Sequence, residues 1–302
     1  MVALTLARGN TSPATAGYAG AFVTVLIWAG WILATRHSAG TALSTIDLGL
    51  IRYGVPALLL APLWLKTGLL PRKLPILLLA LMVAGSGAVF FQVSAFAIHS
   101  VPASSVGILL GGSMPLATAL IGITIFGERP DRMRMVGFAA IVAGVAILLT
   151  RNLAVSVSTG WIGYALLPAA ATLWAIYTHA FRRSGLSPLQ GSALIAAWSF
   201  LIHLALAACF GSTLASVPVK EIALQITSQG ILSGLIAMVA YGFAVKSLGG
   251  TQAAAFTALT PVLAMIGGAI LLGEQIGPFE MLAAIVTAIG VALSTGILST
   301  RT

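Results

Sequence analysis

Four aromatic residues have the spacing of a binding site for a flat or cationic group. Trp28 and Trp31 stand three residues apart in one apolar segment, and Trp174 and Tyr177 repeat that spacing in another. Residues at i and i+3 of a helix share a face, so each segment presents one aromatic face. Two such faces together can stack on a flat side chain or hold a cation. Ordinary packing between helices is the alternative role for the same rings.

Polar side chains deep in other apolar segments are a second group of candidates, because burying them in a membrane is costly unless they are paired or face water. Gln92 can bind a carboxylate or an amine, and His203 is a candidate proton-sensitive group. The structural alternative for both is a hydrogen bond between helices. Arg52, beside Tyr53, attracts a carboxylate if it faces a cavity, and otherwise snorkels to the nearer interface.

Two prolines lie in the middle of apolar runs. Pro115 and Pro261 both follow small or polar residues, with Met114 directly before the first of them. A proline in a membrane helix frees a carbonyl that neighbours or water must satisfy. We expect kinks that line and gate a pathway, and a purely structural bend is the alternative. The candidate substrate-binding residues are Trp28, Trp31, Tyr53, Gln92, Met114, Trp174, Tyr177 and His203, with Pro115 and Pro261 as gating residues. No catalytic or metal-binding residue is predicted.

The composition is that of a membrane protein. Hydrophobic residues make up 59% of the chain and charged residues 7%, against roughly 25% charged in soluble domains. The formal net charge is +9, but the basic residues stand in small groups at the ends of apolar runs, so we expect no nucleic-acid partner. The single cysteine, Cys209, excludes an internal disulfide and a cysteine-based metal cluster. No cofactor is expected.

The lengths of the apolar runs predict ten crossings, since about 20 apolar residues span a bilayer as a helix. Residues 1–16 are small and polar and are expected to form a flexible tail. The predicted helices cover residues 17–39, 44–66, 73–99, 102–126, 132–150, 160–182, 188–210, 220–247, 250–273 and 278–299.

The chain is an internal duplication. The run 115–128 begins with proline, ends with Gly-Glu, and returns as 261–274 after 146 residues (261 − 115 = 146). The same offset relates the two aromatic pairs, so we expect one five-helix repeat at 17–152 and a second at 160–302. Because five is odd, the second repeat must enter the membrane from the opposite side, which predicts two inverted halves with the substrate site where they meet.

The basic residues predict the orientation of the chain. With the N-terminus on one side, that side carries eleven Lys and Arg residues and the other carries three, with Arg52 left inside a helix. Basic loops favour the cytoplasm, so both termini are expected there, in a bacterial inner membrane. The eleven are Arg8, Lys66, Arg72, Lys73, Arg129, Arg132, Arg134, Arg182, Arg183, Lys246 and Arg301, and the three are Arg36, Arg151 and Lys220.

These features resemble a known family. Each half has a penultimate helix of the form Pro-x11-Gly-Glu and a final helix with Gly-Val-Ala, at 144–146 and 290–292. The pattern resembles the drug/metabolite transporter superfamily and its EamA-type repeat. Within that superfamily, the size and the aromatic pairs look most like the YddG-type aromatic amino acid exporters. The resemblance implies an exporter of small amphipathic metabolites, with the fifth and tenth helices as peripheral supports.

Two other functions are alternatives to the export of amino acids. Proton-coupled drug exporters of the same superfamily depend on a carboxylate in the middle of their first helix, whereas residues 24–28 contain no acid. An intramembrane serine protease needs Gly-x-Ser-Gly, but Met114 follows Gly112-Ser113, and an enzyme gains nothing evident from an inverted duplication. We therefore expect a carrier that is not an enzyme, with a small-molecule substrate and lipid as partners. The sequence does not decide between a monomer and a homodimer.

Overall fold

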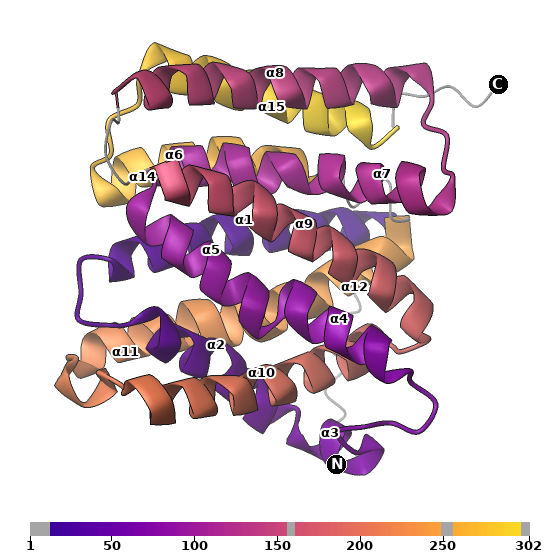
Figure 1. The fold of residues 1–302 in the computed structure, drawn as a ribbon, viewed down its shortest axis with the longest axis vertical. Coiled ribbons are helices and arrows are strands. Elements are labelled where there is room, and N and C mark those ends of the chain that lie inside the picture. Colours follow the sequence, from indigo (N-terminus) through magenta and orange to yellow (C-terminus); the bar gives the residue numbers. More distant parts are fainter. Residues whose placement is uncertain (1–12, 156–160, 249–255, 297–302) are drawn as a thin grey trace, which may run out of the picture.

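The computed structural model describes residues 13–155, 161–248 and 256–296, and these residues form helices and connections with no strand (Figure 1). By length and composition, seven helices can cross a membrane, a bent pair provides an eighth span, and two shorter apolar helices bring the set to ten. The fold is therefore the predicted all-helical polytopic membrane protein with two repeats.

The first repeat contains eight α-helices and one π-helical segment. They are α1 Pro13–Ser38, α2 Thr45–Leu59, α3 Ala61–Thr67, α4 Ile76–Ser86, α5 Ala88–Ser100, α6 Ala103–Val106, η1 Gly107–Gly111, α7 Gly112–Phe126 and α8 Arg132–Val155. The helix α1 begins at Pro13 and not at residue 17, so the predicted tail is shorter, and residues 1–12 lie outside the described part of the chain.

The second repeat, like the first, contains five spans. Its elements are α9 Trp161–Ser184, α10 Pro188–Phe210, η2 Leu214–Ser216, α11 Val219–Gln225, the π-helical η3 Ile226–Ile236, α12 Ala237–Leu248, η4 Phe256–Leu259, α14 Thr260–Leu272 and α15 Pro278–Ser294. The predicted ninth segment began at residue 250, and its first six residues lie outside the described part, as do residues 297–299 of the predicted tenth.

Two spans predicted as continuous helices are broken. The segment 44–66 divides into α2 and α3, which meet at 73°, with Pro62 in the first turn of α3, where a missing N–H is tolerated. The segment 73–99 divides at Gly87. There the Ser199 hydroxyl accepts a hydrogen bond from the Ala88 N–H at 3.1 Å, in space that a Cβ at Gly87 would occupy.

The two repeated prolines occupy different positions. Pro115 lies inside α7 as predicted, directly after η1. It cannot donate to the carbonyl of Gly111, which is the last residue of that π-helical segment. The prediction of a mid-helix position was wrong for Pro261, which stands in the first turn of α14 after the 3₁₀ segment η4. A proline at a first turn fits the helix without breaking a hydrogen bond.

The repeats interlock through equivalent helices. The helix α1 packs on α12, its counterpart α9 packs on α4 and α5, and α2 packs on α10. We call the side of the bundle where α1 ends and α9 begins the far side, and the side where α10 begins the near side; in Figure 1 these are left and right. A Cβ at Gly163, near the start of α9, would touch Ser100 at the end of α5, which places both on the far side.

The helices α8 and α15 form a separate pair at one edge of the bundle, at the top of Figure 1. Their backbones approach closely at two glycines, because a Cβ on Gly137 would lie 2.7 Å from the carbonyl oxygen of Gly290. Small residues allow such close packing of membrane helices. The pair leaves the other eight spans to form the centre of the molecule.

On the far side, Asp47 joins the two repeats. Its carboxylate completes the capping box that Ser44 begins at the start of α2. The same carboxylate accepts hydrogen bonds from the Ser212 hydroxyl and from both the N–H and the hydroxyl of Thr213, at 3.1 and 2.6 Å. Ser212 and Thr213 follow α10 in the second repeat, so a buried carboxylate holds the two halves together here.

On the near side, the counterpart of this contact is absent from the described residues. A matching capping box of Ser187 and Gln190 begins α10, but the Gln190 side chain bonds only to the Ser187 N–H, at 3.0 Å. Gln190 instead lines a surface cleft of about 360 Å³ beside the connection between α3 and α4. Among the described residues, the capping box of α10 therefore does not join the two repeats as Asp47 does.

Candidate functional site

The aromatic residues of the two repeats meet at the centre of the bundle. The ring centroids of Trp28 on α1 and Trp174 on α9 are 5.9 Å apart, with the planes at 82°, an edge-to-face contact. Trp28 also contacts Tyr241 of α12 at 5.4 Å, and Trp174 contacts Tyr177 at 5.1 Å. Three helices from both repeats therefore contribute rings to one group.

A buried phenylalanine extends this group toward the far side. Phe90 on α5 lies 5.4 Å from Trp174 and is stacked on Trp31 at 6.3 Å, with the planes 29° apart. We call the whole set the aromatic cluster: Trp28, Trp31, Phe90, Trp174, Tyr177 and Tyr241. Its rings contact one another, so in this structure they form a packed cluster, and no ligand-sized gap separates the two aromatic faces that the sequence predicts.

The members of the aromatic cluster differ in their exposure. Phe90, Trp31 and Tyr177 are buried, whereas Trp28 and Trp174 are only partly buried. Met114, directly before Pro115 in α7, is also partly buried and packs against the same core. Tyr241 is partly buried as well, so the accessible part of the cluster comprises the two tryptophans that the repeat relates and the tyrosine beside Trp28.

Arg52 lies at the far-side end of the aromatic cluster and does not snorkel. Its side chain is buried, and its Nη1 donates to Gln229 Oε1 at 3.2 Å and to Ser233 Oγ at 3.0 Å, both on η3. The centre of the guanidinium lies 4.9 Å from the Trp31 ring. The amide of Gln229 also donates to the Thr35 hydroxyl at 2.8 Å, so α1, α2 and η3 are joined here.

Gln92, His203 and Tyr53 form a neighbouring polar group. The Gln92 amide donates to the Thr45 carbonyl and lies 2.9 Å from Nε2 of His203, whose Nδ1 is 2.7 Å from the Ser199 carbonyl. The arrangement fits a neutral imidazole that donates through Nδ1 and accepts through Nε2. The Tyr53 ring is stacked on His203 at 5.5 Å. Gln92 and His203 thus make the interhelical hydrogen bonds of the structural alternative.

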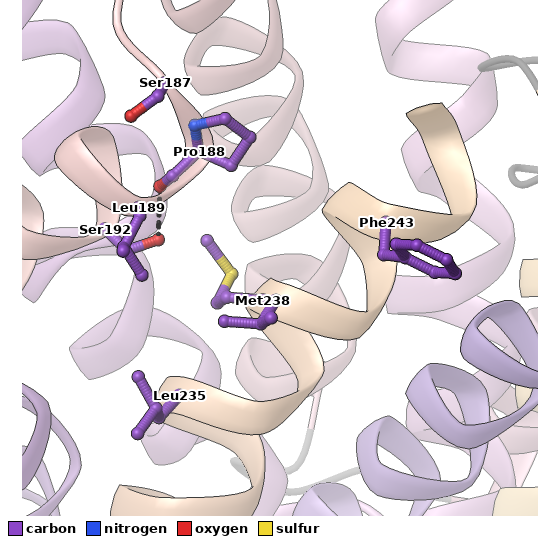
Figure 2. A pocket seen from close by; sticks show the side chains of 8 residues that line it. Ser187, Pro188, Leu189, Ser192, Leu235, Met238 and Phe243 are labelled. Carbon is purple, nitrogen blue, oxygen red and sulfur yellow. Dashed lines mark hydrogen bonds between the residues drawn. The ribbon is translucent and has the colours of Figure 1, made fainter. Parts of the chain in front are cut away.

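An apolar cleft opens on the near side between the two helices that flank this centre. Figure 2 shows it between the first turns of α10 and the C-terminal part of the η3–α12 span, with a volume of about 240 Å³. Met238 and Leu235 line it from one side, and Pro188 and Ser192 from the other. Tyr241, a member of the aromatic cluster, lies on the same turn of α12 as Met238.

The geometry is that of a membrane protein whose two repeats meet at a central aromatic contact, and comparison with known proteins gives its family. The EamA-like transporter family matches residues 15–150 and again residues 161–296. The chain belongs to the EamA-like transporter family. The members of that family are described as transporters.

One sequence relative and one solved structure resemble this EamA-like transporter. An uncharacterized protein of Pseudomonas aeruginosa, PA1977, is 32% identical over 201 residues, which is 64% of this chain and 66% of that protein. The match thus spans slightly less than two thirds of the relative's length. A crystal structure of a protein that is 18% identical has a TM-score of 0.65 and covers 96% of this chain and 100% of the other. At that identity, the likeness concerns the fold alone.

Sequence reasoning missed several residues of this EamA-like transporter's centre. Phe90 and Tyr241 were not among the candidates, because single aromatics in apolar helices are common. Gln225, Gln229 and Ser233 were missed as well, although they recur every four residues in an otherwise apolar segment. That spacing places polar groups on one face of a helix, and it is the signal that would have found the partners of Arg52.

Proposed function

We propose that this EamA-like transporter exports small amphipathic metabolites, and that aromatic and bulky apolar amino acids, as in the YddG-type exporters, are its substrates. The contact between Trp28 and Trp174 carries the proposal. These rings belong to different repeats, they are partly exposed, and they lie at the centre of the bundle. A flat side chain is the group that best replaces one ring against another.

The strength of the ring contact suits a transport cycle. An aromatic pair contributes only about 0.5–1.5 kcal/mol beyond its buried area, so a substrate side chain can displace one ring from the other at little cost. Because each tryptophan belongs to a different repeat, parting the rings requires a relative movement of the repeats. Binding and alternating access are thereby coupled at one contact.

The substrate site extends from this contact along the two aromatic helices. Trp31, Tyr177 and Met114 surround Trp28 and Trp174. Pro115 provides the kinked part of α7 that moves when the pathway opens or closes. Tyr53, Gln92 and His203 form the polar wall toward the far side. Their side chains hydrogen-bond to one another and to backbone carbonyls, so their role is to shape the far-side end of the site.

The proposed direction of transport follows from the charges and from the near-side cleft. Most Lys and Arg residues belong to the near-side ends of the helices, which is typical of the cytoplasmic side of an inner membrane. The cleft in Figure 2 opens on this side, next to the turn that carries Tyr241. Substrate then enters from the cytoplasm and leaves from the far side, and both termini are cytoplasmic.

Uptake into proteoliposomes tests the proposal. Purified protein is reconstituted and offered labelled tryptophan, phenylalanine, leucine or a quaternary-ammonium dye, with and without a pH gradient. We expect saturable flux of tryptophan and phenylalanine that Trp28→Ala and Trp174→Ala each abolish. Trp161→Ala is the matched control, because Trp161 stands on the same helix as Trp174 but is 56% exposed, and this variant should transport normally.

Two results would overturn the proposal. If only the dye moves, and only against a proton gradient, the protein is a drug antiporter and not an amino acid exporter. If Trp161→Ala reduces flux as much as Trp174→Ala does, the loss of any tryptophan is harmful and the central contact has no special role. Folding of each variant is verified by its thermal unfolding in detergent.

A further inference from the structure

We infer that Arg52 and the indole N–H of Trp31 together form a binding site for the carboxylate of the transported substrate. The inference rests on the proposed transport of amphipathic metabolites through the aromatic cluster, and it adds the charge class of those metabolites. It is carried by a buried cation that has no counter-ion, beside a buried donor that has no acceptor, in the part of the chain that the structure describes.

The first observation concerns the charge of Arg52. Its side chain is 9% exposed, and a charged group within a membrane helix is costly unless an opposite charge lies beside it. The described residues include every acidic side chain of the protein, and none of them pairs with Arg52. Its partners are two neutral oxygens, those of Gln229 and Ser233.

Aromatic faces supply the rest of the surroundings of this cation. The guanidinium centre lies 4.9 Å from the Trp31 ring, 5.4 Å from Phe91 and 5.9 Å from Tyr53. Cation–π contacts stabilise an arginine partially, but they leave its full positive charge in place. Both hydrogen bonds to η3 leave from Nη1, and a guanidinium carries five N–H donors in all. The group therefore retains the donors for an anionic partner.

The second observation is independent of charge. Nε1 of Trp31 is buried and has no hydrogen-bond partner among the described residues. A buried N–H without an acceptor is rare and destabilising. Since the Trp31 ring lies against the guanidinium, one acceptor group placed beside both would satisfy the indole N–H and balance the charge. A carboxylate has the two oxygens needed for both donors.

The position of this pair relative to the aromatic cluster identifies the kind of carboxylate. Trp31 is stacked on Phe90, and Phe90 contacts Trp174, so ring contacts run without a gap from Arg52 to the central tryptophans. A ligand whose carboxylate sits at Arg52 places an apolar side chain along these rings. The site thus fits an amphipathic carboxylate, such as an amino acid, and discriminates against an amine that lacks one.

A structural role is the competing explanation, in which Arg52 only braces α2 against η3. Binding measurements on the full-length protein in detergent separate the two explanations. Isothermal titration is carried out with three probes of similar size: phenylalanine, 3-phenylpropionate, which lacks the amine, and phenethylamine, which lacks the carboxylate. We expect the two carboxylates to bind and phenethylamine to bind more weakly, by on the order of tenfold.

Three variants locate the effect. Arg52→Gln should weaken both carboxylates by about tenfold or more and leave phenethylamine unchanged, and Arg52→Lys should recover part of the loss, since it keeps the charge but not the planar fork. Trp31→Phe keeps an aromatic ring and removes the N–H, and should weaken binding of the carboxylates by about threefold or more. Arg183→Gln is the matched control, because Arg183 also lies over an aromatic ring, 3.7 Å from Phe126, but on the near side.

The experiments distinguish a wrong inference about Arg52 from a wrong proposal about the transported substrate. If Arg52→Gln binds the carboxylates as wild type does, or loses all three probes equally, or if neither carboxylate binds the wild-type protein, the inference is wrong. If carboxylates bind through Arg52 but no aromatic amino acid crosses proteoliposomes, the inference stands and the proposed substrate is wrong. Should Arg52→Gln not fold, Trp31→Phe and Arg52→Lys still decide the matter through the same three probes.

Discussion

Arg36 Nε lies 3.2 Å from Glu274 Oε1, an ion pair that joins the end of α1 in the first repeat to the end of α14 in the second. The other carboxylate oxygen of Glu274 accepts the Ala103 N–H at the start of α6, at 2.8 Å. The repeat offset relates these two residues to Arg182 and Glu128 (36 + 146 = 182; 274 − 146 = 128). Among the described residues, this second pair makes no ion pair on the near side.

Glu274→Gln should therefore destabilise the empty protein, whereas Glu128→Gln should not. The first change weakens an ion pair whose side chains are 29% and 16% exposed, and we expect a loss of about 1–2 kcal/mol in the free energy of unfolding. The second removes a charge that is unpaired here, with an expected effect within about 0.5 kcal/mol. Thermal unfolding in detergent measures both. Equal effects of the two changes would show that the ends of α7 and α14 are held alike.

Asp47→Ala should loosen the connection after α10. The variant removes the acceptor of the Ser212 hydroxyl and of the Thr213 N–H and hydroxyl, and each lost bond to a charged group costs about 1.5–3 kcal/mol. Amide hydrogen exchange should accelerate at residues 211–217. Gln190→Ala is the control, because Gln190 caps its own helix only, and it should leave the exchange at residues 211–217 unchanged. Protection that persists in Asp47→Ala would contradict the role assigned to Asp47.

Gly107→Val should separate the fourth and ninth spans. A Cβ at Gly107 would lie 2.8 Å from the Cα of Pro261 and 3.1 Å from the Cβ of Ala264, so a larger side chain must push backbone away. We expect a loss of stability of about 1–3 kcal/mol or a failure to fold. Gly111→Ala is the matched substitution, since its Cβ would meet Thr260 at an ordinary 3.5 Å, and its thermal unfolding should stay near that of the wild type. A tolerated valine at position 107 would show that the two spans are not tightly packed.

Cys209 provides a direct measurement of orientation. It is the only cysteine of the chain, it is exposed, and it lies in the last turn of α10 on the far side. If the far side faces away from the cytoplasm, a membrane-impermeant maleimide should label intact cells, and Cys209→Ser should abolish the signal. Labelling that appears only after the membrane is permeabilised would reverse the proposed direction.

Much of the fold could be predicted, because it depends on patterns that are present in the amino-acid sequence itself. The ten spans follow from the lengths of apolar runs, and the interlock of the repeats follows from the offset between them. The break at Gly87 could not be predicted, because Ser199 lies there from another repeat. The π-helical segments η1 and η3 could not be predicted for a different reason, since their hydrogen-bond pattern leaves no trace in the composition.

The residues of the candidate site could be predicted where both repeats carry matching side chains. They could not be predicted where only one repeat carries them. Trp28 and Trp174 are related by the offset, and their rings lie in contact. Arg52 has no basic counterpart at position 198, where the chain has tryptophan, and its partners Gln229 and Ser233 stand far away in the sequence. Trp31 Nε1 is a buried donor that lacks an acceptor among the described residues. The sequence does not reveal such a donor, because it depends on how the side chains pack.

The unequal capping boxes of α2 and α10 have a consequence for the resting carrier. A duplicated chain with identical halves would have no preference between facing one side of the membrane and facing the other. Here one box ends in a carboxylate, Asp47, and the other in an amide, Gln190, and hydrogen bonds to a carboxylate are stronger. Together with the Arg36–Glu274 ion pair, this difference between a carboxylate and an amide is expected to favour a resting conformation that is closed on the far side and open on the near side. In the proposed transport cycle, the duplication would then supply both directions of access, and a few unmatched charged residues would set the preferred one.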